Sequence, residues 1–178
     1  MPGKIETVAW DTCIFLAWLK NESRATGEME GVAQSLANIE NGTCALVTSA
    51  IIHTEIHPTR LSDDVQEKFK NFLTRSNIEV VPADTPVNRL AGELQEFYDI
   101  QKKIDGLGRL STPDAIHLAT ALIYEVDAFY TFDDNGDTKC RGLIPLSGNV
   151  AGRKLTICKP PFTPPPPPPP MQHKLFKP

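Results

Sequence analysis

The 178-residue sequence lacks long apolar runs, a leading apolar segment and an excess of basic residues. No uninterrupted apolar run approaches the roughly 20 residues that a membrane helix needs, so we expect no membrane contact. The first residues contain no apolar segment of the kind found in signal peptides, which favours a cytoplasmic protein. The formal net charge of −4 argues against a protein that holds nucleic acid by bulk electrostatics alone.

Paired cysteines and glycine-rich phosphate loops are also missing. The four cysteines form no C-x-x-C pair, which predicts neither a zinc knuckle nor a disulfide framework. His53 and His57 are four residues apart, so a helix would bring them together as a zinc pair. Pro58, however, disfavours helical geometry at His57. No Walker-type or dinucleotide-binding loop is present.

Segments with strand character alternate with segments of helical spacing along the chain. We expect strands at residues 5–10, 44–48, 78–81 and 128–132, with helices between them, including 26–41, 49–57 and one opening at Thr112-Pro113 with Thr112 as its cap. This alternation predicts an α/β fold, a three-layer α/β/α sandwich with a mostly parallel central sheet. Residues 143–146 are interpreted as a fifth strand, held to an edge by Pro145.

The end of the chain changes in composition. Pro160, Pro161 and the run Pro164–Pro170 cannot donate backbone hydrogen bonds, so we expect a solvent-exposed polyproline II segment. We therefore predict one domain over residues 1–158 and a proline-rich, disordered tail over 159–178. The tail is interpreted as a spacer or a free end, with docking into an aromatic groove as the alternative.

Four acidic residues are predicted to meet at one edge of the sheet. Asp11 follows the first strand, Glu55 lies on the short helix after the second, Asp114 is in the first turn of the helix at 112, and Asp133 follows the strand at 128–132. Ligands bind at the carboxyl ends of parallel strands. Clustered carboxylates resist joint ionisation, and a divalent cation relieves that conflict. Oxygen ligands select Mg²⁺ or Mn²⁺, which suits phosphodiester hydrolysis.

Each acid also has an ordinary structural explanation when it is taken alone. Asp11 fits a helix cap, Glu55 a solvated helix face, Asp114 a partner of the helix dipole and Asp133 a turn aspartate. The metal hypothesis therefore rests on all four positions together. Asp137 is the alternative to Asp133, which we prefer because it follows its strand without a gap.

Four segments resemble the motifs of the PIN-domain family, over roughly residues 5–147. They are Val8-Ala-Trp-Asp-Thr12, Ser49-Ala-Ile-Ile-His-Thr-Glu-Ile56, Thr112-Pro-Asp-Ala-Ile-His-Leu-Ala-Thr-Ala-Leu122 and Tyr130-Thr-Phe-Asp133. The third is the most specific of them.

The resemblance implies an Mg²⁺- or Mn²⁺-dependent endoribonuclease that hydrolyses RNA to 5′-phosphate and 3′-hydroxyl ends. Many bacterial members are VapC-type toxins, which form homodimers and are silenced by an antitoxin peptide in the active-site groove. Carried over to this sequence, the resemblance makes Asp11, Glu55 and Asp114 metal ligands and Asp133 the fourth acid. Thr12 and Thr131 would supply supporting hydroxyl groups.

Two other functions stay open on the sequence alone. The first is a catalytically silent PIN-like scaffold or binding module, and the second is a hydrolase of small phosphoesters. His117, three residues after Asp114, is interpreted as a buried histidine with a satisfied ring, with catalysis as the alternative. Near the loop before Asp114, basic side chains fit either RNA phosphate contacts or a solvated surface: Lys102, Lys103 and Arg109.

Overall fold

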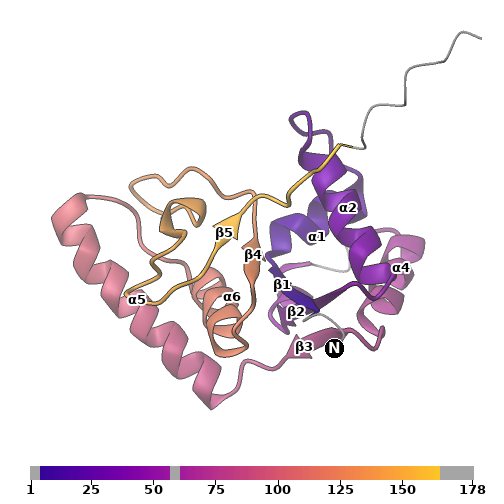
Figure 1. The fold of residues 1–178 in the computed structure, drawn as a ribbon. Helices are drawn as coiled ribbons and strands as arrows, with labels where there is room; N and C mark the ends of the chain where they lie inside the picture. The colour runs from indigo at the N-terminus through magenta and orange to yellow at the C-terminus, as the bar shows by residue number, and fades with distance from the viewer. Residues whose placement is uncertain (1–4, 57–60, 165–178) are drawn as a thin grey trace, which may run out of the picture.

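The computed structural model describes residues 5–56 and 61–164, and it places a parallel sheet at the centre of the chain (Figure 1). The strands are β1 (Glu6–Trp10), β2 (Cys44–Ser49), β3 (Ile78–Val81), β4 (Ala128–Tyr130) and β5 (Ile157–Cys158). Their order is β3-β2-β1-β4-β5, and every neighbouring pair is parallel. All carboxyl ends therefore meet at one edge, as the sequence predicted.

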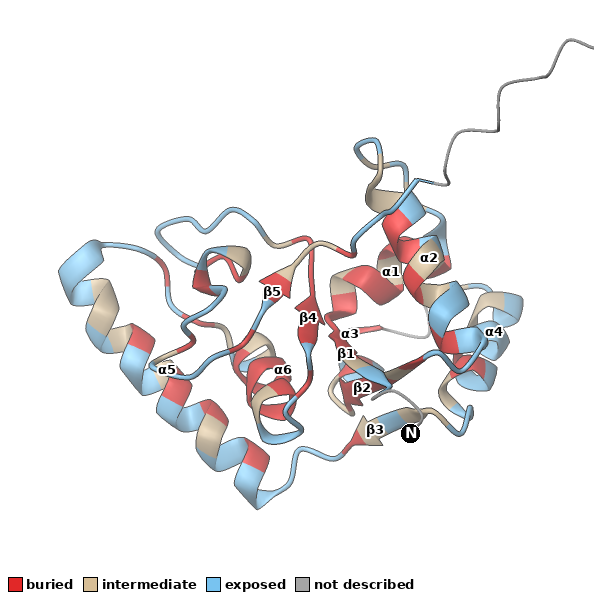
Figure 2. Cartoon of the chain, in the orientation of Figure 1, coloured by how far each residue is buried: buried red, intermediate tan, exposed pale blue. Residues whose placement is uncertain are grey.

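Helices cover both faces of this sheet, which confirms the α/β sandwich. They are α1 (Thr12–Lys20), α2 (Glu28–Glu40), α3 (Ile52–Glu55), α4 (Asp63–Leu73), α5 (Thr85–Asp105) and α6 (Thr112–Ile123). Helices α1, α2 and α4 lie on one side, and α5 and α6 lie on the other (Figure 2). Within the described ranges, no helix combines the length and the apolar character needed to cross a membrane.

Alternation along β1 builds two separate cores. Val8 and Trp10 point into the core under α1, α2 and α4, whereas Ala9 points into the core under α5 and α6. Successive side chains of a strand point to opposite faces, so a strand buried on both sides reads as an unbroken apolar run. Trp10 is fully buried and donates its indole N–H to Ser35 Oγ at 3.2 Å.

The predicted strand at 143–146 is wrong. Residues Ile144–Leu146 form a short 3₁₀ helix, η2, and the fifth strand is β5, which pairs with β4. The backbone N–H groups of Leu143 and Ile144 both donate to the Asp133 carbonyl, at 3.0 and 2.9 Å. That closure folds the segment back on itself, and Pro145 has no N–H with which to join a ladder.

The predicted cap of α6 is also displaced by one residue. Ser111, not Thr112, is the N-cap: its hydroxyl accepts a hydrogen bond from the Asp114 backbone N–H at 3.2 Å. A serine followed three residues later by an acid is a known signal for a helix start, so the sequence did contain this information.

The segment after β5 runs along α2 instead of leaving the fold at once. Pro160 is buried, contrary to the expected exposure, whereas Pro161 and Pro164 are exposed as predicted. A Cβ on Gly31 of α2 would lie 2.1 Å from the Pro160 carbonyl oxygen, so only glycine fits this contact. Thr163 N donates to Gln34 Oε1 at 2.9 Å. The domain boundary at residue 158 stays a prediction, and most of the predicted tail lies outside the described residues.

Candidate active site

Asp11 lies where β1 ends and α1 begins, at the carboxyl edge of the sheet. Its Oδ1 caps α1 by accepting from Thr12 N at 2.7 Å. Its Oδ2 accepts from Thr131 Oγ1 at 2.7 Å and from Cys13 Sγ at 3.1 Å. Burial and the nearby Asp11 charge raise the pKa of the Cys13 thiol, so this sulfur stays protonated as a donor. The Asp11 carboxylate is thus 7% exposed and held in one orientation.

Asp133 is tied to Asp11 through Thr131. The Thr131 hydroxyl donates to Asp11 and accepts from the Asp133 backbone N–H at 3.0 Å. Burial raises the pKa of Asp133, and the Asp11 charge raises it further. The short T-x-D segment therefore brings the first and fourth predicted acids to one place.

Asp114 lies in the first turn of α6 and completes the acidic cluster. Its Oδ2 accepts from Ser111 Oγ at 2.5 Å. Burial raises its pKa from 3.8 to about 6, and the charges of Asp11 and Asp133 contribute to the rise against the lowering effect of the Ser111 hydrogen bond. Three of the predicted acids therefore act on one another electrostatically.

Glu55 is held by a different set of contacts. Its Oε2 accepts from Thr12 Oγ1 at 2.6 Å and pairs with His117 Nε2 at 2.8 Å. Burial alone would raise the pKa of Glu55, but the hydrogen bonds from His117 and Thr12 outweigh burial and lower it. His117 is 2% exposed, which confirms the interpretation of a buried histidine with a ring nitrogen satisfied. The sequence did not reveal that its partner is the second acid.

The remaining sequence candidates make contacts with groups other than the four acids. Asp137 Oδ1 accepts from the backbone N–H groups of Lys139 and Cys140, at 2.6 and 2.7 Å, and this exposed turn contact lowers its pKa. Lys102 donates to the Thr138 carbonyl, and Arg109 forms an exposed ion pair with Asp99.

The zinc pair that the sequence disfavoured, His53 and His57, involves a residue outside the described ranges, His57. His53 is exposed, and its ring contacts Phe69 at a centroid distance of 6.0 Å. Nothing described about His53 adds support to the zinc hypothesis.

In residues 5–56 and 61–164, no group of three or more His, Cys, Asp or Glu side chains is arranged to hold a metal ion. Glu55 is engaged by His117 and Thr12, and one Asp114 oxygen is engaged by Ser111. By ligand type alone, the carboxylate oxygens of Asp11, Asp114 and Asp133 suit a hard divalent cation, and the charges of Asp11 and Asp133 place Asp114 in a negative field. Such a field is the condition that a bound cation relieves.

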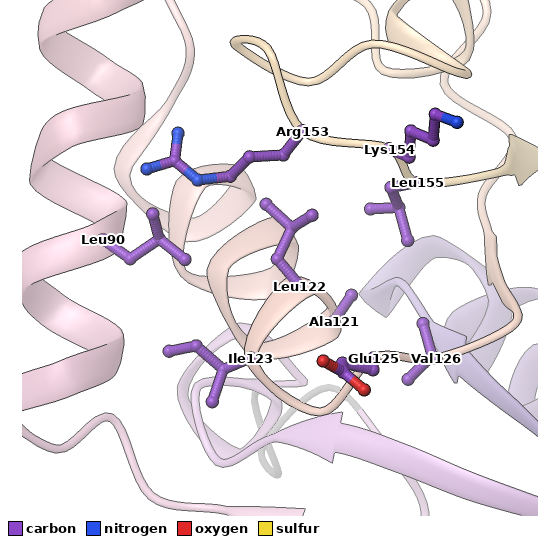
Figure 3. Close-up of a pocket in the computed structure, with 9 residues that line it drawn as sticks. All are labelled: Leu90, Ala121, Leu122, Ile123, Glu125, Val126, Arg153, Lys154 and Leu155. Carbon is purple, nitrogen blue, oxygen red and sulfur yellow. The ribbon is translucent and has the colours of Figure 1, made fainter.

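A separate pocket of about 400 Å³ opens at the other end of α6 (Figure 3). Leu122 and Val126 line it together with Leu90 of α5, and Arg153 and Lys154 lie at its border. Asp114 is eight residues before Leu122, roughly 12 Å along a helix. This pocket is therefore not part of the acidic cluster.

Comparison with known proteins supports the same fold. One chain of the crystal structure of VapBC2 from Rickettsia felis, bound to a DNA fragment from their promoter, aligns with a TM-score of 0.56 at 15% identity, covering 85% of this chain and 98% of that one. FitAcB from Neisseria gonorrhoeae aligns with a TM-score of 0.50 at 18% identity, covering 71% and 87%. At these identities, the likeness speaks for the fold alone. A comparison with curated protein sequences gave no match.

The family itself follows from the sequence match. The PIN domain model matches residues 8–139, a span that begins within β1, passes through the three clustered aspartates and ends in the loop after β4. This chain belongs to the PIN domain family.

Proposed function

We propose that this chain is an Mg²⁺- or Mn²⁺-dependent endoribonuclease and the toxin of a toxin–antitoxin pair. PIN domains are generally nucleases. The observation that carries the proposal is the cluster of Asp11, Asp114 and Asp133 at the carboxyl edge of the sheet, in which Asp11 and Asp133 raise the pKa of Asp114. Three carboxylates that oppose one another's ionisation are suited to a divalent cation.

In this proposal, Asp11, Glu55, Asp114 and Asp133 would hold the metal, with Asp133 as the fourth acid. The chemistry that such a metal would supply is activation of a water and neutralisation of charge on the phosphodiester. One Thr131 hydroxyl binds the Asp11 carboxylate and the Asp133 backbone N–H, and Thr12 and His117 bind the Glu55 carboxylate. These neighbours hold the Asp11 and Glu55 carboxylates before a ligand arrives, which reduces the ordering cost of binding.

Cleavage of a single-stranded RNA with Mn²⁺ tests the proposal. We expect Asp114→Asn to abolish cleavage and Asp137→Asn to leave it intact, because only Asp114 belongs to the cluster. Products with 5′-phosphate ends are expected, and removal of the metal with EDTA should stop the reaction. Full cleavage by Asp114→Asn would refute the assigned site. A simple phosphomonoester in parallel distinguishes a nuclease from a small-phosphoester hydrolase.

The capture of Glu55 by His117 favours one alternative, a catalytically silent PIN scaffold. A carboxylate already paired at 2.8 Å is less free to bind a cation. Calorimetry discriminates between the two functions: binding of Mn²⁺ by the folded wild type supports the nuclease, whereas the absence of any binding supports the scaffold.

We further propose an antitoxin partner, because one chain of VapBC2, a toxin–antitoxin complex, shares the fold of this chain. A toxin that acts on cellular RNA beside such a partner belongs in the cytoplasm. Co-expression with the product of a small reading frame directly upstream tests the pairing: a complex that survives gel filtration supports it. A freely migrating toxin would contradict it.

A homodimer is the other assembly that we propose, and α5 offers a surface for it. On this helix, Phe97, Ile100 and Ile104 are 40%, 53% and 74% exposed and recur at helical spacing. Exposed Glu96 and Lys103 flank this stripe on one side, so an antiparallel crossing near Ile100 brings opposite charges together. Light scattering should give a dimer that Ile104→Asp dissociates; a monomeric wild type would refute the assembly.

A further inference from the structure

Two loops, residues 106–111 and 133–143, each end or begin at a residue that bears on the acidic cluster. Residues 106–111 lead into α6 and end at Ser111, which binds Asp114. Residues 133–143 follow β4 and begin at Asp133. The separation of Asp114 and Asp133 therefore depends on how these two loops are held against each other.

Backbone contacts join the two loops directly. Arg109 N donates to the Lys139 carbonyl at 3.0 Å, and Arg141 N donates to the Arg109 carbonyl at 2.9 Å. At Gly108, a Cβ would lie within 2.3 Å of the Cys140 carbonyl carbon, so the backbones touch without an intervening side chain.

One buried side chain of loop 133–143, Arg141, reaches across this contact and binds groups of α5 and of loop 106–111. It is 7% exposed, and two of its nitrogens donate to the Asp105 carboxylate at 3.1 Å. Its Nε donates to the Gly108 carbonyl at 3.1 Å, and its guanidinium lies 5.0 Å from the Tyr98 ring centroid. The planar fork of arginine can bind the Asp105 carboxylate and the Gly108 carbonyl at once, which lysine cannot reproduce.

We propose that Arg141 is a positioning residue that clamps loop 106–111 to loop 133–143 and thereby sets the separation of Asp114 and Asp133. Only short stretches of chain separate the clamp from the two acids. Two residues after Arg141, Leu143 N holds the Asp133 carbonyl, and three residues after Gly108, Ser111 holds Asp114. The proposal relies on the proposed function for the role of the two acids as metal ligands.

The test compares Arg141→Ala with Arg75→Ala. Arg75 makes an exposed ion pair with Glu40, far along the chain from both loops, and serves as the matched control. We expect Arg141→Ala to bind Mn²⁺ about 10- to 100-fold more weakly by calorimetry, the range typical when a group supporting metal ligands is lost. Hydrogen exchange at the Arg109 and residue-141 amides should become faster, and Arg75→Ala should change neither measurement.

Chemical rescue separates positioning from a general loss of stability. Millimolar guanidinium should restore Mn²⁺ binding and slow exchange in Arg141→Ala, because it can occupy the site between Asp105, Gly108 and Tyr98. Arg141→Lys should not restore either property. Unchanged exchange and Mn²⁺ affinity in Arg141→Ala, or a loss that guanidinium leaves untouched, would overturn the clamp.

Failure of the clamp differs from failure of the proposed function. A wild type that neither binds Mn²⁺ nor cleaves RNA refutes the nuclease, and hydrogen exchange then still decides whether Arg141 joins the loops. A wild type that does both, beside an Arg141→Ala variant that matches it, refutes the clamp alone.

Discussion

Replacing Asp114 with asparagine should stabilise the metal-free protein at neutral pH. The pKa of Asp114 is raised from 3.8 to about 6, first by burial and then by the charges of Asp11 and Asp133. A rise of about two units corresponds to roughly 3 kcal/mol of free energy that opposes folding with the carboxylate ionised. Asparagine has nearly the same shape, carries no charge and keeps an oxygen that accepts from Ser111 Oγ.

The gain should depend on pH in a defined direction. Between pH 3.8 and about 6, the folded state binds more protons at Asp114 than the unfolded state does, so wild-type stability falls as the pH rises. Above pH 7 the full penalty is present, and Asp114→Asn escapes it. At pH 4 most of the penalty is already gone, and well below pH 3.8 the wild-type carboxyl is protonated in both states and the advantage of the variant disappears.

Urea and thermal unfolding in EDTA, at pH 4 and pH 7.5, measure this difference. For a protein of this size, about 3 kcal/mol corresponds to a rise in Tm of roughly 6–12 °C at pH 7.5. Asp137→Asn is the matched control, because backbone hydrogen bonds lower the pKa of Asp137 and its carboxylate is favoured in the folded state. No gain in stability for Asp114→Asn at pH 7.5, or an equal gain at both pH values, would show that ionised Asp114 does not oppose folding.

Unfolding measurements also test two single contacts and the metal site. In urea, Gly31→Ala should lower the free energy of unfolding by about 1–3 kcal/mol, because its Cβ would meet the Pro160 carbonyl at 2.1 Å. Gly92→Ala, at a position in α5 with open space around it, should raise the free energy of unfolding by about 0.5–1 kcal/mol. Equal effects of the two substitutions would refute the role of the Pro160 contact. Thr12→Val should lower the free energy of unfolding by about 1–3 kcal/mol, since it removes the hydroxyl that donates to Glu55 at 2.6 Å. An unchanged denaturation midpoint would contradict this prediction. Mn²⁺ should raise the wild-type Tm in proportion to the logarithm of its concentration, and a flat response would speak against the metal site.

Local sequence patterns determined the fold class of this protein and the edge of the sheet at which the acids lie. Apolar runs such as the one over Val8–Trp10 predict strands buried on both faces, and such strands belong to parallel sheets covered by helices. The carboxyl ends of parallel strands lie at one edge of the sheet. Asp11 and Asp133 were therefore predicted to lie close together, because each follows a predicted strand. Their convergence needed no knowledge of any side-chain contact.

Only the tertiary structure decided the contacts between segments far apart in the chain. The pairing of Glu55 with His117 spans 62 residues, and the Thr131 bond to Asp11 spans 120. The fate of residues 143–146 depended on the Asp133 carbonyl, and the burial of Pro160 depended on Gly31. Spacing along a sequence reports which face of its own element a residue occupies, but not which side chain of another element reaches it. The four acids could thus be predicted as neighbours, whereas the division into three coupled aspartates and a glutamate held by His117 arose from packing.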